Sequence, residues 1–294
     1  MRTLAILLLV PLAACAWPGH ARAAQNYDAC TGTVASLPAT ISTPGTWCVK
    51  QDLATSIASG SAITVTANDV VLDCNDFGID GSAAGISSLA TGISASDTLH
   101  TEIRRCRVSG FSTGIALTTT GVGGGHRVEG NHLAANLLVG INVEGDGSRV
   151  QHNDVFATGS AAGAAGSLYG IRTAGSVDVL DNTVAGLVAT TGGNGATIGI
   201  YTDFTGASTG SVSVDGNRVK GLHADGTGKA TAVYLHSTNG RGAVRNNDLS
   251  GDGSTGSVGI SCASATDRAR YNIIDGFATF LVTCFNAGHN DEKH

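Results

Sequence analysis

Proline, methionine, lysine and aromatic residues are scarce in this 294-residue chain. Pro occurs four times, the last at Pro44, Met occurs once, and Lys and Glu occur four times each. Because Glu, Lys and Met are good helix formers, their scarcity argues against a helical protein. Beyond the leader, no apolar run approaches the 18 residues of a membrane span. The net charge of −6 disfavours a nucleic-acid binder. The 42 glycines and 42% apolar residues indicate a folded, glycine-rich β protein.

The first 23 residues have the pattern of an export signal. Arg2 supplies the positive end, residues 4–12 the apolar core, and Ala21-Arg22-Ala23 a small-x-small cleavage site. The segment 12–15 also resembles a bacterial lipoprotein box, so a lipid anchor at Cys15 is the alternative. Both routes predict an extracytoplasmic protein, which is periplasmic, secreted or attached to the outer membrane as a lipoprotein.

An irregular internal repeat is the most informative feature of the chain. Each unit has an apolar or small residue, two variable residues, then Asn or Cys, and another mostly apolar residue two positions later. The Asn or Cys residues are Cys74, Cys106, Asn131, Asn153, Asn182, Asn217, Asn247 and Asn272. Between them recurs a Gly-Ile element, at Gly92-Ile93, Gly114-Ile115, Gly140-Ile141, Gly170-Ile171, Gly199-Ile200, Ala232-Val233 and Gly259-Ile260.

These short units predict a solenoid, because a unit of this length cannot bury its own apolar face without stacking on its neighbours. Asn tolerates the left-handed backbone of a tight corner. Its amide can also bond to the Asn of the next coil, so Asn153, Asn182 and Asn217 are expected to form a buried ladder. Strand residues alternate in and out, which turns one Ile or Val of each strand inward.

The units resemble those of right-handed parallel β-helix proteins of the pectin-lyase-like superfamily, including the periplasmic NosD-like group. Segments 37–53 and 71–81 resemble the entry segment and the first coil of that group, and the resemblance covers about residues 30–288. It implies a single all-β solenoid of about eight coils with a disulfide-closed N-terminal cap. An antiparallel β-sandwich is the alternative, although regular Asn-Gly or Asp-Gly hairpins are missing. The predicted parts are a signal peptide (1–23), the cap (24–56), the β-helix (57–288) and a tail (289–294).

Six cysteines remain after Cys15, and an even number in an exported chain indicates disulfides. Equivalent positions on adjacent coils lie about 4.8 Å apart, within the range of Cα separations that a disulfide spans. The alignment of the repeats therefore predicts two bonds between neighbouring coils, Cys74–Cys106 and Cys262–Cys284. The remaining pair, Cys30–Cys48, would then close the N-terminal cap.

The Gly-Ile strands place a set of polar residues on one outer face of the middle coils. These residues are Asn142, Glu144, Arg172, Tyr201, Asp203, Tyr234 and His236. The resemblance implies sugar binding along such a face. Tyrosines offer flat apolar surface to sugar rings, while Arg and carboxylates bind hydroxyls or uronates. Tyr201 and Tyr234 are predicted to form the floor of a glycan site with Asn142 as a further contact. The simpler interpretation is a solvated polar face.

Four residues of this face are candidates for a catalytic role: Arg172, Asp203, His236 and Glu144. A lyase needs a base and a cation beside a uronate. Glu144 and Asp203 would lie two coils, or about 10 Å, apart, at the upper limit for an inverting hydrolase. The paired-Asp and Gly-His-Gly signatures of polygalacturonases are missing, as is the Asp-Pro-His-Glu signature of alginate epimerases.

A second charged strip has mixed signs, which predicts surface ion pairs. Its members are Arg104, Arg105, Arg107, Glu129, His132, His152 and Asp154. The histidines are scattered and the only Met is the initiator, so neither a metal nor a cofactor is expected. The sequence favours a glycan-binding protein, which is expected to be a monomer. The alternatives are a polysaccharide lyase or glycoside hydrolase, and a structural or adhesive surface protein that uses loops 157–168 and 189–197.

Overall fold

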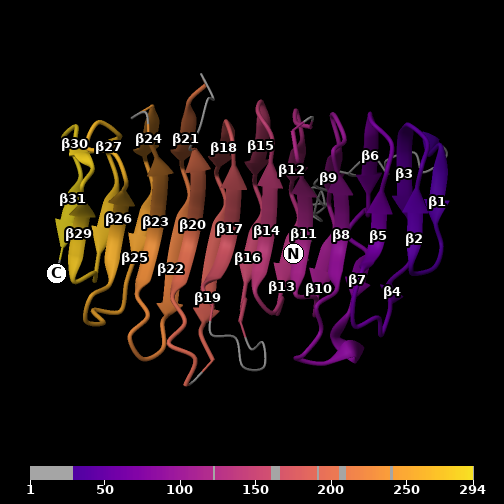
Figure 1. Ribbon diagram of the computed structural model, residues 1–294, viewed down its shortest axis with the longest axis horizontal. Coiled ribbons are helices and arrows are strands. Elements are labelled where there is room, and N and C mark those ends of the chain that lie inside the picture. The colour runs from indigo at the N-terminus through magenta and orange to yellow at the C-terminus, as the bar shows by residue number, and fades with distance from the viewer. Residues whose placement is uncertain are drawn as a thin grey trace, which may run out of the picture.

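The computed structural model describes residues 29–121, 123–159, 166–190, 192–204, 210–238 and 241–293, and these form a parallel β-helix. Every ladder between the named strands is parallel, and the coils follow one another along the long axis of the molecule (Figure 1). The antiparallel sandwich is therefore excluded. The predicted export signal and the lipid site at Cys15 lie outside the described residues.

Three sheets run the length of the solenoid, and each coil contributes one strand to each, in the order B, A, C. Sheet A contains β1 (Gly32–Val34), β3 (Gly45–Val49), β6 (Val70–Asp73), β9 (Glu102–Arg104), β12 (Arg127–Glu129), β15 (Ser148–Gln151), β18 (Val177–Leu180), β21 (Val212–Asp215), β24 (Gly242–Arg245), β27 (Arg268–Arg270) and β30 (Phe285–Asn286).

Sheet B is formed by the Gly-Ile elements. Its strands are β2 (Ala39–Ile41), β5 (Ser61–Val65), β8 (Thr91–Ser96), β11 (Thr113–Thr118), β14 (Val139–Glu144), β17 (Leu168–Ala174), β20 (Thr197–Phe204), β23 (Ala230–Ser237), β26 (Val258–Cys262) and β29 (Thr279–Val282). The longest of these, β20 and β23, have eight residues each and lie side by side.

Sheet C follows the Asn corners. Its strands are β4 (Leu53–Ala54), β7 (Gly78–Asp80), β10 (Arg107–Ser109), β13 (His132–Ala134), β16 (Asp154–Phe156), β19 (Thr183–Val188), β22 (Arg218–His223), β25 (Asp248–Ser250), β28 (Ile273–Asp275) and β31 (Asp291–Lys293). A short 3-10 helix, η2 (Ser82–Ala84), lies between β7 and β8.

The solenoid of the described residues is longer than predicted, with ten coils instead of about eight. Strands β2, β3 and β4 of the predicted cap already form a full coil, because they pair with β5, β6 and β7. At the other end β31 of the predicted tail pairs with β28. Within the described residues, strands of both the predicted cap (24–56) and the predicted tail (289–294) thus continue the ladders of the β-helix.

The core is a set of aliphatic columns inside the three sheets. Ile93, Ile115, Ile141, Ile171 and Ile200 are fully buried and paired in register, as the Gly-Ile pattern predicts. The residues two positions after the corners are also buried and form the matching column of sheet C, which includes Val108, Leu133, Val155, Val184, Val219, Leu249 and Ile274.

The Asn ladder is present at the corner between sheets A and C. Asn153, Asn182 and Asn217 are no more than 1% exposed, and each side-chain amide donates to the next Asn Oδ1 at 3.0 Å. The left-handed backbone, however, falls on the residue before each Asn, for example His152 (φ 54°) and Asp181 (φ 53°). The expectation that Asn itself adopts it was wrong. The Asn backbone N–H points along the solenoid instead, toward the next Asn Oδ1.

All three predicted disulfides are present. The Cα atoms are 6.0 Å apart in Cys30–Cys48, 4.7 Å in Cys74–Cys106 and 5.0 Å in Cys262–Cys284. One detail of the repeat alignment differs. Val71 and Ile103 each lie three residues before a corner Cys and were aligned, but Ile103 pairs with Leu72. The first corner is wider than the others, with left-handed conformations at both Asn75 and Asp76, and it absorbs the one-residue shift.

Asp267 is fully buried, and its charge is a cost to the fold. Its Oδ1 accepts hydrogen bonds from the Gly242 N–H at 2.9 Å and the Ser237 hydroxyl at 3.3 Å, whereas Oδ2 has no partner among the described residues. Burial raises the pKa of this carboxyl above its ordinary value of 3.8.

Asp267→Asn is therefore expected to stabilise the protein at neutral pH. The pKa of the Asp267 carboxyl is higher in the folded than in the unfolded state. Its protonation therefore adds to the free energy of unfolding below the unfolded pKa, and this contribution is lost as pH rises through the folded pKa. The variant should gain free energy of unfolding at pH 7, and the gain should shrink below about pH 4. Urea unfolding at both pH values measures this, with the exposed Asp275→Asn as the matched control. An equal gain at both pH values would contradict the assignment.

Candidate functional site

The outer face of sheet B brings the predicted polar residues into two adjacent rows. Cα pairing places Asn142, Arg172, Tyr201 and Tyr234 in one row across β14, β17, β20 and β23. The second row contains Glu144, Ala174, Asp203 and His236. The rows follow the alternation of the strands, because each of these residues lies one or three positions after an inward Ile or Val.

Tyr201, Asp203 and His236 form a hydrogen-bonded cluster at the centre of this face. The Tyr201 hydroxyl lies 3.1 Å from His236 Nδ1 and 3.5 Å from Asp203 Oδ2. His236 Nδ1 is 3.4 Å from Asp203 Oδ1. Burial, followed by the Asp203 carboxylate, raises the pKa of Tyr201 to about 12. The hydroxyl therefore stays protonated at neutral pH and can donate a hydrogen bond.

Three tyrosine rings line this cluster. Tyr201 lies 5.5 Å from Tyr234 and 5.5 Å from Tyr169, at interplanar angles of 79° and 64°. Tyr201 and Tyr234 are neighbours as predicted, but in edge-to-face contact, so they do not make one flat floor. This arrangement follows from the ring quadrupoles, which favour tilted pairs over parallel faces.

Tyr169 was missed by the sequence reasoning. Counting back from Ile171 by simple alternation would turn Tyr169 inward. Gly170 and Ile171 are both buried, however, and a Cβ on Gly170 would lie 2.4 Å from Val184 Cγ1. The strand thus departs from alternation at the glycine, which turns Tyr169 toward Tyr201. The Tyr-Gly-Ile order alone gives no sign of this departure.

Arg172 lies between Asn142 and Tyr201 in the first row and is the cation of the site. Its guanidinium forms no hydrogen bond or ion pair within the described part of the chain. Asn142 is 8% exposed, and its amide donates to Glu144 Oε1 at 3.4 Å. Arg172 is thus available to a ligand on a face where most other polar groups are already engaged.

Glu144 lies apart from the cluster. Its Oε2 accepts a hydrogen bond from the Thr119 N–H at 3.3 Å, and it borders a separate hollow of about 300 Å³ that also includes Asp146. Glu144 and Asp203 occupy the same row with Ala174 between them, two strands apart. The structure therefore brings Asp203 and His236 together around Tyr201, with Arg172 beside Tyr201 on the adjacent strand, and leaves Glu144 on the far side of Ala174.

The second charged strip is mostly engaged in ion pairs. Arg104 and Arg105 both bind Asp73, while His152 lies between Glu129 and Asp181 at 4.0 and 3.8 Å. His132 and Asp154 are 4.0 Å apart on sheet C. Arg107 is the exception and has no such partner among the described residues.

Neither a metal cluster nor a membrane helix is found in the described ranges. No group of three or more His, Cys, Asp or Glu side chains there is placed to hold a metal ion. No helix there is long and apolar enough to span a bilayer.

The fold and site together define a disulfide-bonded parallel β-helix protein with a tyrosine-lined outer face. No family model and no curated protein sequence matches the chain. It is similar in structure to the Dettilon tailspike protein, with 15% identity and a TM-score of 0.42. An alginate lyase from Paenibacillus has 13% identity and a TM-score of 0.38, and DFA-IIIase from Arthrobacter chlorophenolicus 12% and 0.35.

These matches cover 89%, 87% and 84% of the chain. The chain in turn spans 57% of the tailspike protein, 98% of the alginate lyase and 63% of DFA-IIIase. Similarity at this level carries no information about activity.

Proposed function

We propose that the outer face of sheet B, from β14 to β23, binds a polysaccharide or cell-surface glycan. The observation that carries this is the row formed by Asn142, Arg172, Tyr201 and Tyr234. In this row a guanidinium without an ion pair among the described residues lies beside tyrosine rings. Tyrosines combine apolar ring surface with a hydroxyl, which suits a sugar ring. Arg172 supplies a planar donor set for hydroxyls or a carboxylate. The glycan runs along the solenoid axis, across the strands.

A polysaccharide lyase or glycoside hydrolase that acts on a uronate-containing glycan is the second candidate. The hydrogen bond between the Tyr201 hydroxyl and His236 Nδ1 favours the lyase. In such a reaction a base removes the proton beside the carboxylate, and an acid protonates the departing oxygen. His236 and Tyr201 are groups of these two kinds, and Arg172 would hold the carboxylate. Hydrolysis would instead use the Glu144 and Asp203 carboxylates.

Tyr201→Ala and Tyr234→Ala are expected to weaken glycan binding by about tenfold or more, because each removes a ring and a hydroxyl from the site. A glycan array followed by titration calorimetry measures this. Tyr271→Ala removes an exposed tyrosine far from this face and is the matched control. If both site variants bind every glycan as the parent does, the face is not the site.

Product analysis on each bound glycan distinguishes binding from cleavage. The lyase predicts an unsaturated product that disappears in His236→Ala and Arg172→Ala. Intact glycan after prolonged incubation with the parent protein supports the binding function alone. Absence of binding to any glycan would favour a structural or adhesive protein, whose proposed contact loops lie only partly within the described residues.

We place the mature protein outside the cytoplasm, in the periplasm, in the medium or on the outer membrane. Three disulfides are suited to an oxidising compartment, and the leader has the pattern of an export signal. The proposed membership of the NosD-like periplasmic group is supported by the resemblance of segments 37–53 and 71–81 to that group. Mass spectrometry of the exported chain would distinguish cleavage after Ala23 from lipidation at Cys15.

A further inference from the structure

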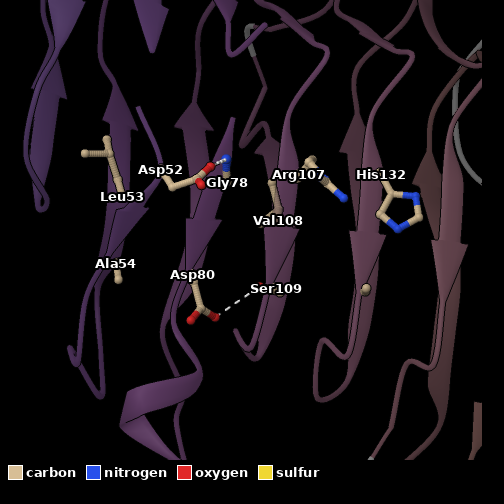
Figure 2. Close-up of a pocket in the computed structure, with 10 residues that line it drawn as sticks. Asp52, Leu53, Ala54, Gly78, Asp80, Arg107, Val108, Ser109 and His132 are labelled. Carbon is tan, nitrogen blue, oxygen red and sulfur yellow. Dashed lines mark hydrogen bonds between the residues drawn. The ribbon is translucent and has the colours of Figure 1, made fainter. Parts of the chain in front are cut away.

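A groove on the outside of sheet C crosses the first four coils, on a different sheet from the tyrosine-lined face. It has a volume of about 490 Å³ and is lined by residues of β4, β7, β10 and β13 (Figure 2). Its polar groups come from Asp52, Asp80, Arg107, Ser109 and His132. Because adjacent strands lie about 4.8 Å apart, the groove extends about 14 Å along the solenoid axis.

The carboxylates at one end of the groove are held in place. The Gly78 N–H donates to Asp52 Oδ1 at 2.7 Å, and the Ser109 hydroxyl donates to Asp80 Oδ1 at 3.0 Å, as Figure 2 shows. Asp80 also accepts hydrogen bonds from the N–H and hydroxyl of Ser82. These contacts fix two acceptors that line the groove, and none of them supplies a cation.

The donors lie at the other end. Arg107 and His132 are paired on adjacent strands, and the Arg107 guanidinium has no hydrogen bond or ion pair within the described ranges. The His132 ring lies 5.5 Å from the Phe156 ring on the next strand. The His132 and Phe156 rings thus form an aromatic pair at the C-terminal side of the groove.

An apolar wall borders the groove where the chain leaves β7. A second hollow of about 440 Å³ shares Asp80 and Ser109 with the first and is lined by Gly85, Ile86 and Leu137. Ile86, on the loop between β7 and β8, is 57% exposed. The loop therefore presents an apolar surface beside a row of fixed hydrogen-bonding groups.

We propose that this sheet C groove is a second carbohydrate site, specific for a neutral oligosaccharide. Sugar hydroxyls both donate and accept, so they can pair with Asp52 and Asp80 at one end and with Arg107 and His132 at the other. Ile86 would cover an apolar sugar face. Two carboxylates against one guanidinium give the groove no excess of positive charge, which disfavours a polyanion. The site is independent of the proposed function of sheet B.

The test uses the full-length exported protein and neutral hexasaccharides of glucose, xylose, mannose and N-acetylglucosamine. We expect at least one to bind and to reduce amide hydrogen exchange in β7, β10 and the loop of Ile86. Arg107→Ala and Ile86→Ser should each weaken that binding by about tenfold, as expected for the loss of a charge-assisted hydrogen bond or an apolar contact. Arg218→Ala is the matched control, because Arg218 lies in the same row of sheet C but is paired with Asp248.

Three outcomes would overturn the proposal. The first is that no neutral hexasaccharide binds at millimolar concentration. The second is that binding protects sheet B instead, and is lost in Tyr201→Ala while Arg107→Ala binds normally. The third is that only uronate oligosaccharides protect the groove, which would refute the neutral ligand class. Failure of the tyrosine variants to affect any glycan would refute the sheet B site and leave this one standing.

Discussion

Asn182→Leu is expected to lower the free energy of unfolding substantially, because it breaks the corner ladder in the middle of the solenoid. The Asn182 amide donates to the carbonyl oxygens of Val150 and Leu180 and to Asn217 Oδ1. Its Oδ1 accepts from the backbone N–H and the side-chain amide of Asn153. Leucine has a similar size but satisfies none of these groups.

Each buried group left without a partner costs about 1–3 kcal/mol. Because Asn182 serves neighbours on both sides, the loss should exceed that of an ordinary surface substitution several-fold. Thermal and urea unfolding measure it, with Lys220→Ala, an exposed site on the adjacent coil, expected to stay within about 0.5 kcal/mol of the parent. Glycan affinity per folded molecule should be unchanged. A variant as stable as the control would mean that the ladder contributes little.

The ladder shows how far the sequence could predict this fold. The spacing from Val to Asn and on to the next apolar residue identified the corner, the inward columns and the positions of the cysteines. It could not identify which residue takes the left-handed conformation, because Arg105, His152 and Tyr271 hold that position as well as Gly130 and Gly216. The residue before the corner Asn varies from coil to coil and gives no common signal. The left-handed conformation was therefore predicted for the Asn, although the residue before it adopts that conformation.

The candidate site was predictable in its rows but not in its contacts. Alternation from Ile200 and Val233 placed Tyr201 and Tyr234 side by side, as their Cα pairing shows. The tilt of the rings and the hydrogen bond from Tyr201 to His236 depend on rotamers, which the sequence pattern does not specify. Tyr169 was hidden by the departure from alternation at Gly170.

The C-terminal coil shows why the sequence repeat ends before the backbone pairing does. The inward positions of β30 and β31 carry polar residues, so the apolar repeat disappears there although the backbone pairing continues. Glu292 pairs with the fully buried Ile274, and Asn286 pairs with the fully buried Ala269. The Asn286 amide donates to Glu292 Oε1 at 3.4 Å, and the Asn290 amide donates to Asn286 Oδ1 at 2.9 Å. A polar network thus covers the last layer of the core.

This network faces the open end of the solenoid, where β29, β30 and β31 are the last strands of their sheets among the described residues. Unpaired strand edges can add strands from another chain, and an inward-pointing charge is one device that prevents it. A second copy that stacked on this end would have to bury the Glu292 carboxylate, at a large desolvation cost. Exposed apolar side chains nearby, such as Phe285 (56% exposed), would otherwise favour stacking.

The double variant Asn286→Val, Glu292→Ile is therefore expected to associate end to end. It replaces the polar layer with aliphatic side chains of the kind found in the columns beneath, so that burial against a second copy becomes favourable. Light scattering after size exclusion, over a range of protein concentrations, should show dimers or larger species at concentrations where the parent shows fewer. Asp291→Asn also removes one negative charge from β31, but at the outward position that pairs with Ile273. If this control associates as strongly as the double variant, net charge and not the inward carboxylate limits stacking. If neither associates, the strand edges are protected by other features of the last coil.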